Sequence, residues 1–256
     1  MTQYVFGSGN MYATQLTDSL GNAIVNPTPY PLMTLQEGSI DISADSKQLH
    51  GQNQYAVAVG RGKASLTVKV KPARVMSGLW NAMFFGQTVS AGLVACYTET
   101  TGAAIPATPF QITAAPPSSG TFVADMGVID ANGSPMVRVA SAPATGQYSV
   151  VVGTGVYTFA SADTGKTVYV NYQYSTATAT TGSNQTVYNQ AMGYAPFFKA
   201  DLTVSYAGKN TSFTFYRCMT SKFSFGMKNE DFAIPEFEFM AMDDGTSKVY
   251  KWSTSE

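Results

Sequence analysis

Two segments around residue 50 alternate polar and apolar residues without interruption, and this alternation restricts the fold more than any other feature of the chain. Neighbouring side chains of a β-strand point to opposite faces, so each segment predicts a strand with one polar and one apolar face. In the first segment the apolar positions are Ile40, Ile42 and Ala44, and in the second they are Ala64, Leu66, Val68 and Val70. The polar positions are Glu37, Ser39, Asp41, Ser43 and Asp45, then Lys63, Ser65, Thr67, Lys69 and Lys71.

Residues 46–61 separate these segments and are too many for a tight turn. We therefore predict a long hairpin with an outreaching loop. Such a hairpin, with one polar face and one apolar face, is typical of a structural element rather than of a catalytic site.

Charged residues make up only 12% of the 256 residues, about half the usual share. A surface with so few charges is poorly protected against association, and we interpret the chain as one that buries its surface against neighbours. The net charge of −1 gives no basic footprint for nucleic acid. Cys96 and Cys218 lie far apart, and we expect both to be small buried hydrophobes. We expect neither a signal peptide nor a membrane span.

One helix is predicted over residues 74–85, where apolar residues recur at helical spacing and Gly86 stands at the C-terminal position. The apolar face of this helix consists of Val75, Met76, Leu79, Trp80 and Met83. Long strands return over residues 198–206, 211–218 and 236–241, whereas residues 121–174 form short strand segments between turn signals.

The predicted fold is mainly β, a sandwich or half-barrel with one packed α-helix and an inserted small β module. Residues 1–100 and 190–256 form the discontinuous body, and residues 101–189 form the insertion.

Catalytic and metal-binding patterns are not found in the sequence, and we expect neither an enzyme, a metal site nor a cofactor. His50 has no motif around it, and a catalytic triad needs a base held between a nucleophile and an acid. The sequence around Gly62 and Lys63 fails as a phosphate loop, since Val57 and Ala64 stand where glycine and Ser or Thr are needed.

Several motifs, in this order along the chain, resemble the major tail tube proteins of tailed bacteriophages. The first lie in the hairpin: residues 38–43 (GSIDIS), 47–57 (KQLHGQNQYAV) and 61–64 (RGKA). The helix with Trp80 and residues 84–86 (FFG) fits the same pattern. The others are residues 125–128 (DMGV), 146–150 (GQYSV), 192–196 (MGYAP) and 228–232 (KNEDF).

The resemblance implies hexameric rings that stack into a tube, with two long hairpins from each subunit in a closed barrel around the lumen. It implies a virion tail assembled in the bacterial host cytoplasm, with a tape measure protein inside and tail terminator and distal tail or baseplate proteins at the ends. Viral DNA would pass through without specific binding, and no membrane is involved.

The polar positions of the first hairpin are the expected lumen lining, namely Glu37, Ser39, Asp41, Ser43, Lys63, Ser65, Thr67, Lys69 and Lys71. Within the hairpin, Asp41 is expected to face Lys69, and Glu37 to face Lys71 or a neighbour. The expected contact to the next ring consists of Leu49, His50, Gln52, Asn53, Gln54 and Tyr55.

Two alternatives remain open. The chain can be a tube protein of a contractile tail or of a secretion system, which the sequence separates poorly from the first interpretation. It can also be a β protein that binds host-surface glycans, with Tyr157, Tyr169, Tyr172 and Tyr174 as the candidate aromatic residues.

Overall fold

Long antiparallel strands from both ends of the chain make one sheet in the computed structural model, which describes residues 4–32, 35–74, 76–178, 180 and 182–255. Contacts divide the chain into a first unit, Met1–Val89 with Gln185–Glu256, and an inserted unit, Ser90–Asn184. The sheet lies in the first unit. Its strands are β1 (Asn10–Gln15), β2 (Pro29–Pro31), β3 (Leu35–His50), β4 (Ala56–Pro72), β15 (Phe198–Tyr206), β16 (Lys209–Phe225), β17 (Pro235–Ala241) and β18 (Tyr250–Thr254).

The strand order is β2-β1-β15-β16-β17-β4-β3, with β18 paired to β16 as well. The long strand β16 joins the two halves of the sheet, because it pairs with β15 and β18 near its start and with β17 near its end. β17 then pairs with β4 from Phe237 opposite Val70 to Met240 opposite Thr67. The strand β3, at the other side of β4, forms an edge of the sheet.

The alternation in β4 matches its burial. Leu66, Val68 and Val70 are buried, whereas Lys63, Ser65 and Lys69 are exposed. The core on the buried face joins these residues to aromatic side chains from β15, β16 and β17, including Phe198, Phe215, Phe237 and Phe239. In β3 the apolar side chains of the same alternation are less buried than in β4: Ile40 is half-buried and Ile42 is exposed.

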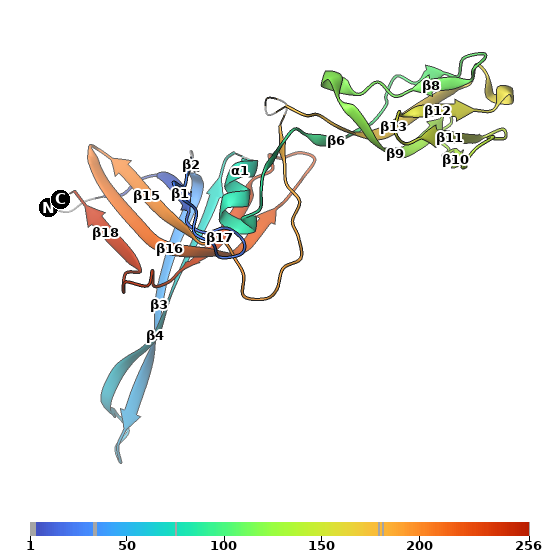
Figure 1. Cartoon of the computed structure of the whole chain (residues 1–256). Helices are drawn as coiled ribbons and strands as arrows, with labels where there is room; N and C mark the ends of the chain where they lie inside the picture. Colours follow the sequence, from blue (N-terminus) through green and yellow to red (C-terminus); the bar gives the residue numbers. More distant parts are fainter. Residues whose placement is uncertain (1–3, 33–34, 75, 179, 181, 256) are drawn as a thin grey trace. The chain divides into compact units, whose positions relative to one another are not determined.

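The distal part of the β3–β4 hairpin projects from the rest of the first unit as a narrow arm (Figure 1). The strands run to His50 and restart at Ala56, so the connecting loop comprises only residues 51–55. The expectation of a loop over residues 46–61 is wrong, because Ser46 to Leu49 pair with residues 58–61 and extend the ladder. Val57 and Val59, two β-branched residues in alternation, favour this extension.

The helix in the structure is shorter than the one that the spacing of apolar residues predicts. An α-helical turn, α1 (Ser77–Trp80), continues into a π-helical turn, η1 (Asn81–Phe85). Met76 has extended backbone, so the helix does not begin at residue 74. Val75 lies outside the described residues. Leu79 and Met83 are buried in the core, as the pattern predicts, and Gly86 ends the helix with a left-handed φ of 61°.

The inserted unit is a second set of short strands with its own core. Its elements are β5 (Ser90–Ala91), β6 (Val94–Tyr97), β7 (Ala103–Ala104), β8 (Gln111–Thr113), η2 (Pro117–Ser119), β9 (Thr121–Asp130), β10 (Val137–Arg138), β11 (Gln147–Val151), β12 (Val156–Phe159), η3 (Ser161–Asp163), β13 (Thr167–Ser175) and β14 (Ser183–Asn184). β13 pairs with β6, β7 and β9, and a second sheet has the order β10-β11-β12-β8. The unit starts at Ser90, upstream of the boundary at residue 101 that composition indicates.

The face of β13 that alternation predicts is buried: Val168, Val170 and Tyr172 belong to the core of the inserted unit. The side chain of Asp125 also lies inside this unit, where its carboxylate accepts hydrogen bonds from the hydroxyls of Tyr148 and Tyr157 at 2.8 and 3.0 Å. Of the two cysteines, Cys218 is buried as expected, but Cys96 is exposed, so the expectation for Cys96 is wrong.

Candidate functional site

The polar face of the first unit's sheet carries a row of alternating charges across four strands. Lys71 on β4 stands opposite Glu37 on β3, and its Nζ lies 2.6 Å from Glu37 Oε2. On β17, Glu236 accepts a hydrogen bond from Lys222 Nζ of β16 at 3.4 Å. Glu37, Lys71 and Glu236 also line one hollow of about 240 Å³ with Ser39 and Lys69. The lysines of this row are therefore flanked by carboxylates.

Lys69 has a different partner from the one expected. The register of β3 with β4 places Ser39 opposite Lys69 and Thr67 opposite Asp41. Lys69 Nζ instead lies 3.7 Å from Glu238 Oε2 on β17, the strand on its other side. The expected pairing of Asp41 with Lys69 is wrong, because Asp41 stands opposite Thr67, two residues from Lys69 along β4. The expected pairing of Glu37 with Lys71 is confirmed.

The rest of the expected lumen residues lie further along the same face. Ser43 and Ser65 stand opposite one another, and their hydroxyl oxygens are 2.8 Å apart. Asp41 and Lys63 are exposed and form no ion pair among the described residues. The hairpin thus brings eight of the nine expected residues together in cross-strand pairs: Glu37, Ser39, Asp41, Ser43, Ser65, Thr67, Lys69 and Lys71. Lys63 lies at the register shift that follows the pair of Ala44 and Ala64.

Sequence reasoning missed part of this face. Glu236 and Glu238 belong to it through the pairing of β17 with β4, and Lys222 belongs to it through the pairing of β16 with β17. The alternation of these glutamates with Phe237 and Phe239 is visible in the sequence, but the strand beside which they lie is not.

Three lysines of this face each have a carboxylate beside them: Lys69 has Glu238, Lys71 has Glu37, and Lys222 has Glu236. The hydrogen bond and the negative charge of Glu37 raise the pKa of Lys71 above its ordinary value. Lys71 therefore stays charged throughout the physiological range, while its charge is locally neutralised.

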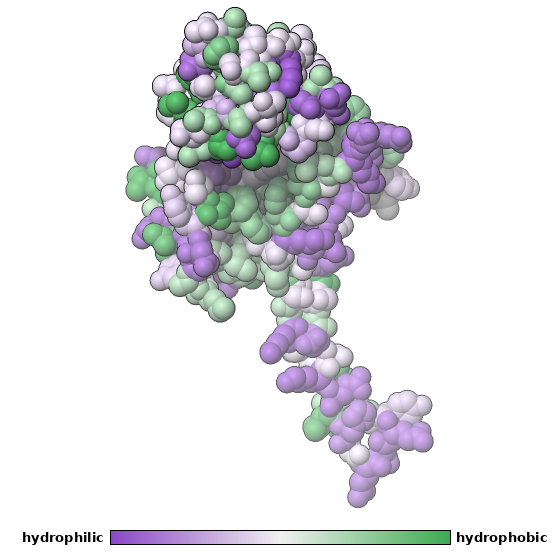
Figure 2. Space-filling model, turned by 90° about the vertical axis from the view of Figure 1, so that its right-hand side faces the viewer, coloured by the Kyte–Doolittle hydropathy of each residue, from purple (hydrophilic) through white to green (hydrophobic). Residues whose placement is uncertain are grey.

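The end of the arm, which we call the hairpin tip, comprises residues 47–59 at the turn of the β3–β4 hairpin. It includes all six residues expected at a contact to the next ring: Leu49, His50, Gln52, Asn53, Gln54 and Tyr55. Tyr55 is 85% exposed and Leu49 is 65% exposed, so the tip has no core of its own. Figure 2 shows the arm as a mainly hydrophilic projection with isolated hydrophobic residues on it.

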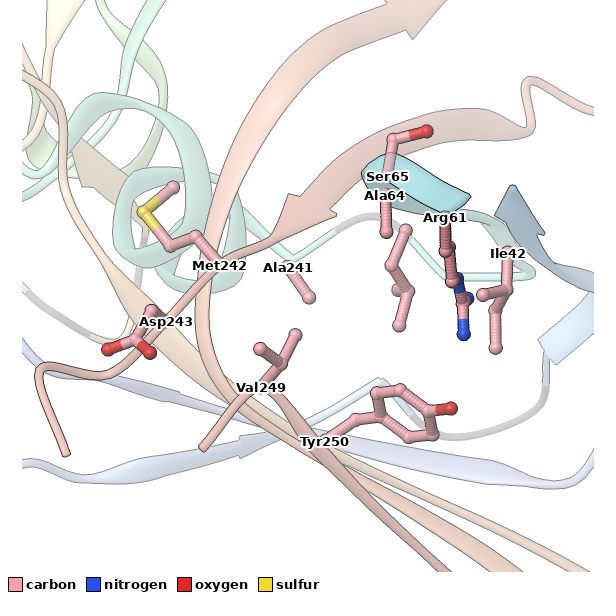
Figure 3. A pocket seen from close by; sticks show the side chains of 10 residues that line it. Ile42, Arg61, Ala64, Ser65, Ala241, Met242, Asp243, Val249 and Tyr250 are labelled. Atoms are coloured by element: carbon pink, nitrogen blue, oxygen red, sulfur yellow. The ribbon is translucent and has the colours of Figure 1, made fainter. Parts of the chain in front are cut away.

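A pocket of about 490 Å³ lies where β4 leaves the side of β17 and the arm begins. Leu66 and Ala241 are among its lining residues, with Ile42 and Arg61 on the hairpin and Val249 and Tyr250 across from them (Figure 3). The guanidinium of Arg61 forms no ion pair among the described residues. The pocket is an open, largely apolar notch between two strand edges.

The groups that could carry other chemistry lie apart from one another. His50 is exposed at the end of β3, and Gly60, Gly62 and Lys63 lie within the strand β4 rather than in a loop. No group of three or more His, Cys, Asp or Glu residues that could hold a metal ion occurs in the described ranges. Among the same residues, no helix is long and apolar enough to cross a membrane.

No protein-family model matches the chain, and no curated protein matches it.

Proposed function

We propose that the chain is a structural protein that polymerises with copies of itself as stacked hexameric rings, forming the tail tube of a tailed bacteriophage. The observation that carries this proposal is the arm: a long, ordered hairpin whose apolar side chains lack a covering layer within the first unit. The ring number and the phage setting rest on the resemblance of the sequence motifs.

The edge strand β3 supports self-association. It is 16 residues long and, in the described part of the chain, pairs with β4 alone. A long edge strand presents a row of unpaired backbone N–H and C=O groups that another chain can pair with. Ile42, Leu49 and Val59 are exposed along the same hairpin, so association also removes apolar surface from water.

The polar face suits the wall of a conduit. Lysines without partners would bind the phosphates of passing DNA, and each neutralised phosphate adds to the salt-dependent affinity. Here Glu37 and Glu238 lie beside Lys71 and Lys69. In the proposed tube this face lines the lumen, where a tape measure protein lies before DNA passes.

Electron microscopy of the purified protein in negative stain tests the proposal. Rings or tubes with a central hole are expected, and compact monomers at high protein concentration would contradict it. A variant that replaces residues 50–57 by an Asn-Gly turn keeps the native pairing of Leu49 with Ala58, and it should keep its far-ultraviolet circular dichroism spectrum but form no tubes. If this variant still forms long tubes, the tip is not the contact between rings.

A further inference from the structure

The two ends of the sheet in the first unit carry different surfaces. β17 is antiparallel to β4, so the start of β17 lies near Pro72 and its end lies near Thr67. The connection between β16 and β17, residues 226–234, therefore lies at the end of β4 opposite to the hairpin tip (Figure 1). At about 3.3 Å per residue, the 17 residues of β4 separate these ends by roughly 55 Å.

The end opposite the tip is aromatic. Trp80 contacts the rings of Phe223 and Phe225 with centroid distances of 4.9 and 5.3 Å, and Phe84 lies 6.1 Å from Phe223. Beyond these rings, residues 226–234 expose Met227 by 79% and Phe232 by 90%. We call this surface the aromatic end: Trp80, Phe84, Phe223, Phe225, Met227 and Phe232.

A buried donor at the aromatic end has no acceptor. The indole Nε1 of Trp80 is shielded from solvent and makes no hydrogen bond to any described residue. A buried N–H group without a partner costs about 1–3 kcal/mol, and native structures rarely leave one so.

The hairpin tip offers complementary groups. Leu49, Tyr55 and Val57 expose apolar surface, and Gln52, Asn53 and Gln54 provide amide oxygens as acceptors. The hairpin tip, residues 47–59, contains Lys47 and no acidic residue. Residues 226–234 contain Glu230 and Asp231 against the single cation Lys228. None of these charged groups has an ion-pair partner among the described residues.

We propose that the aromatic end receives the hairpin tip of a second copy of the chain. This inference rests on the proposed function and names the receiving surface for the tip. A contact between two different surfaces of identical subunits is heterologous, and when it joins opposite ends of the subunit it propagates without closing. Each added ring then buries the exposed apolar groups of both ends and pairs a positive tip with a negative loop.

Disulfide trapping tests the contact. In a Cys96→Ser background, Tyr55→Cys and Phe232→Cys are introduced together, and the protein is oxidised under assembly conditions. A ladder of covalent dimers, trimers and longer species is expected on a non-reducing gel, whereas a mixture of the two single variants should give dimers only. The matched control pairs Tyr55→Cys with Tyr206→Cys, since Tyr206 is exposed elsewhere on the first unit, and should give no ladder.

A charge exchange provides an independent readout. Glu230→Lys should raise the concentration needed for assembly by roughly tenfold, and adding Lys47→Glu should restore it. If the variant with Tyr55→Cys and Phe232→Cys forms tubes but gives no series of cross-linked species on the gel, the inference is wrong and the proposed function still stands. If the unmodified chain shows only monomers by electron microscopy, the proposed function and the inference both fail.

Discussion

The ammonium group of Lys71 lies 2.6 Å from the carboxylate of Glu37, directly across the β3–β4 ladder. Both side chains are substantially exposed, and exposed pairs contribute little to stability. The pair instead neutralises a cation on a face that also carries Lys69 beside Glu238 and Lys222 beside Glu236. The pair should therefore affect what this face binds more than it affects the stability of the fold.

Removal of the carboxylates should convert this face into a DNA-binding surface. Glu37→Gln, Glu236→Gln and Glu238→Gln together leave Lys69, Lys71 and Lys222 without partners. We expect the triple variant to retain double-stranded DNA at about 50 mM salt and to release it at about 200 mM, because binding through phosphates weakens steeply with salt. Fluorescence anisotropy of a labelled duplex measures both states.

The control for this experiment also replaces the three lysines by Gln, which restores the neutrality of the face. That variant and the unmodified chain should show no anisotropy change at either salt concentration. Equal DNA retention by the unmodified chain and the triple variant would mean that the carboxylates do not screen the lysines.

Local alternation predicted the faces of the strands but not what covers them. In β4 the positions of Leu66, Val68 and Val70 were assigned correctly to the dry face, since the core of the sheet lies over them. In β3 the same rule assigned Ile42 to that face, yet it is exposed because the arm leaves the core behind at this point. A period of two residues reports orientation and carries no information about a second layer.

Long-range pairing accounts for most of the candidate site that the sequence did not predict. The partner of Lys69 is Glu238, about 170 residues further along the chain, and no local pattern specifies that β17 lies beside β4. The helix shows the same limit at short range. Gly86 marked its end correctly, but the spacing of apolar residues continues through the extended Met76 and hides the true start.

Asp125 should be the most sensitive polar position of the inserted unit. Its buried carboxylate accepts hydrogen bonds from Tyr148 and Tyr157 and lies 3.6 Å from Arg138 Nη1. Asp125→Asn removes the charge and turns one acceptor into a donor, which we expect to destabilise the unit by about 3 kcal/mol. Hydrogen exchange of the β11 and β12 peptides in the full chain measures the loss.

Asp130→Asn is the matched control for Asp125, because the carboxylate of Asp130 accepts backbone hydrogen bonds in an exposed turn. It should cost at most about 1 kcal/mol. Equal acceleration of exchange in both variants would show that the tyrosine hydroxyls do not depend on the buried charge.

Low pH should lower the stability of the inserted unit, because it protonates the carboxylate of Asp163. Burial alone would raise the pKa of this carboxyl, but hydrogen bonds from Lys166 Nζ at 2.7 Å and from the Gly146 amide at 2.8 Å hold its pKa below the ordinary value. A lowered pKa in the folded state gives stability that is present above the unfolded pKa of about 4 and is lost as the pH falls below it. Hydrogen exchange in residues 144–147 should therefore accelerate below about pH 4 more in the unmodified chain than in Asp163→Asn, relative to each protein's own rate at pH 6. A pH dependence unchanged in Asp163→Asn would contradict this role.

Gly86 should tolerate no side chain, because its backbone and its surroundings both exclude one. Its φ of 61° is left-handed, and a Cβ there would lie 2.7 Å from the Ser19 amide nitrogen and 2.9 Å from Pro196 Cβ. A non-glycine residue in this conformation costs about 1–2 kcal/mol, and the displacement of neighbouring backbone adds to it. Gly86→Ala should therefore destabilise the first unit by about 2 kcal/mol or more.

Gly60→Ala is the matched control, since nothing lies within 4 Å of its added Cβ, and it should change stability by less than about 0.5 kcal/mol. Trp80 and Trp252, the two tryptophans of the chain, both belong to the first unit, so their fluorescence during urea unfolding reports its stability. Equal urea midpoints for the two variants would show that the helix end can relax around a side chain.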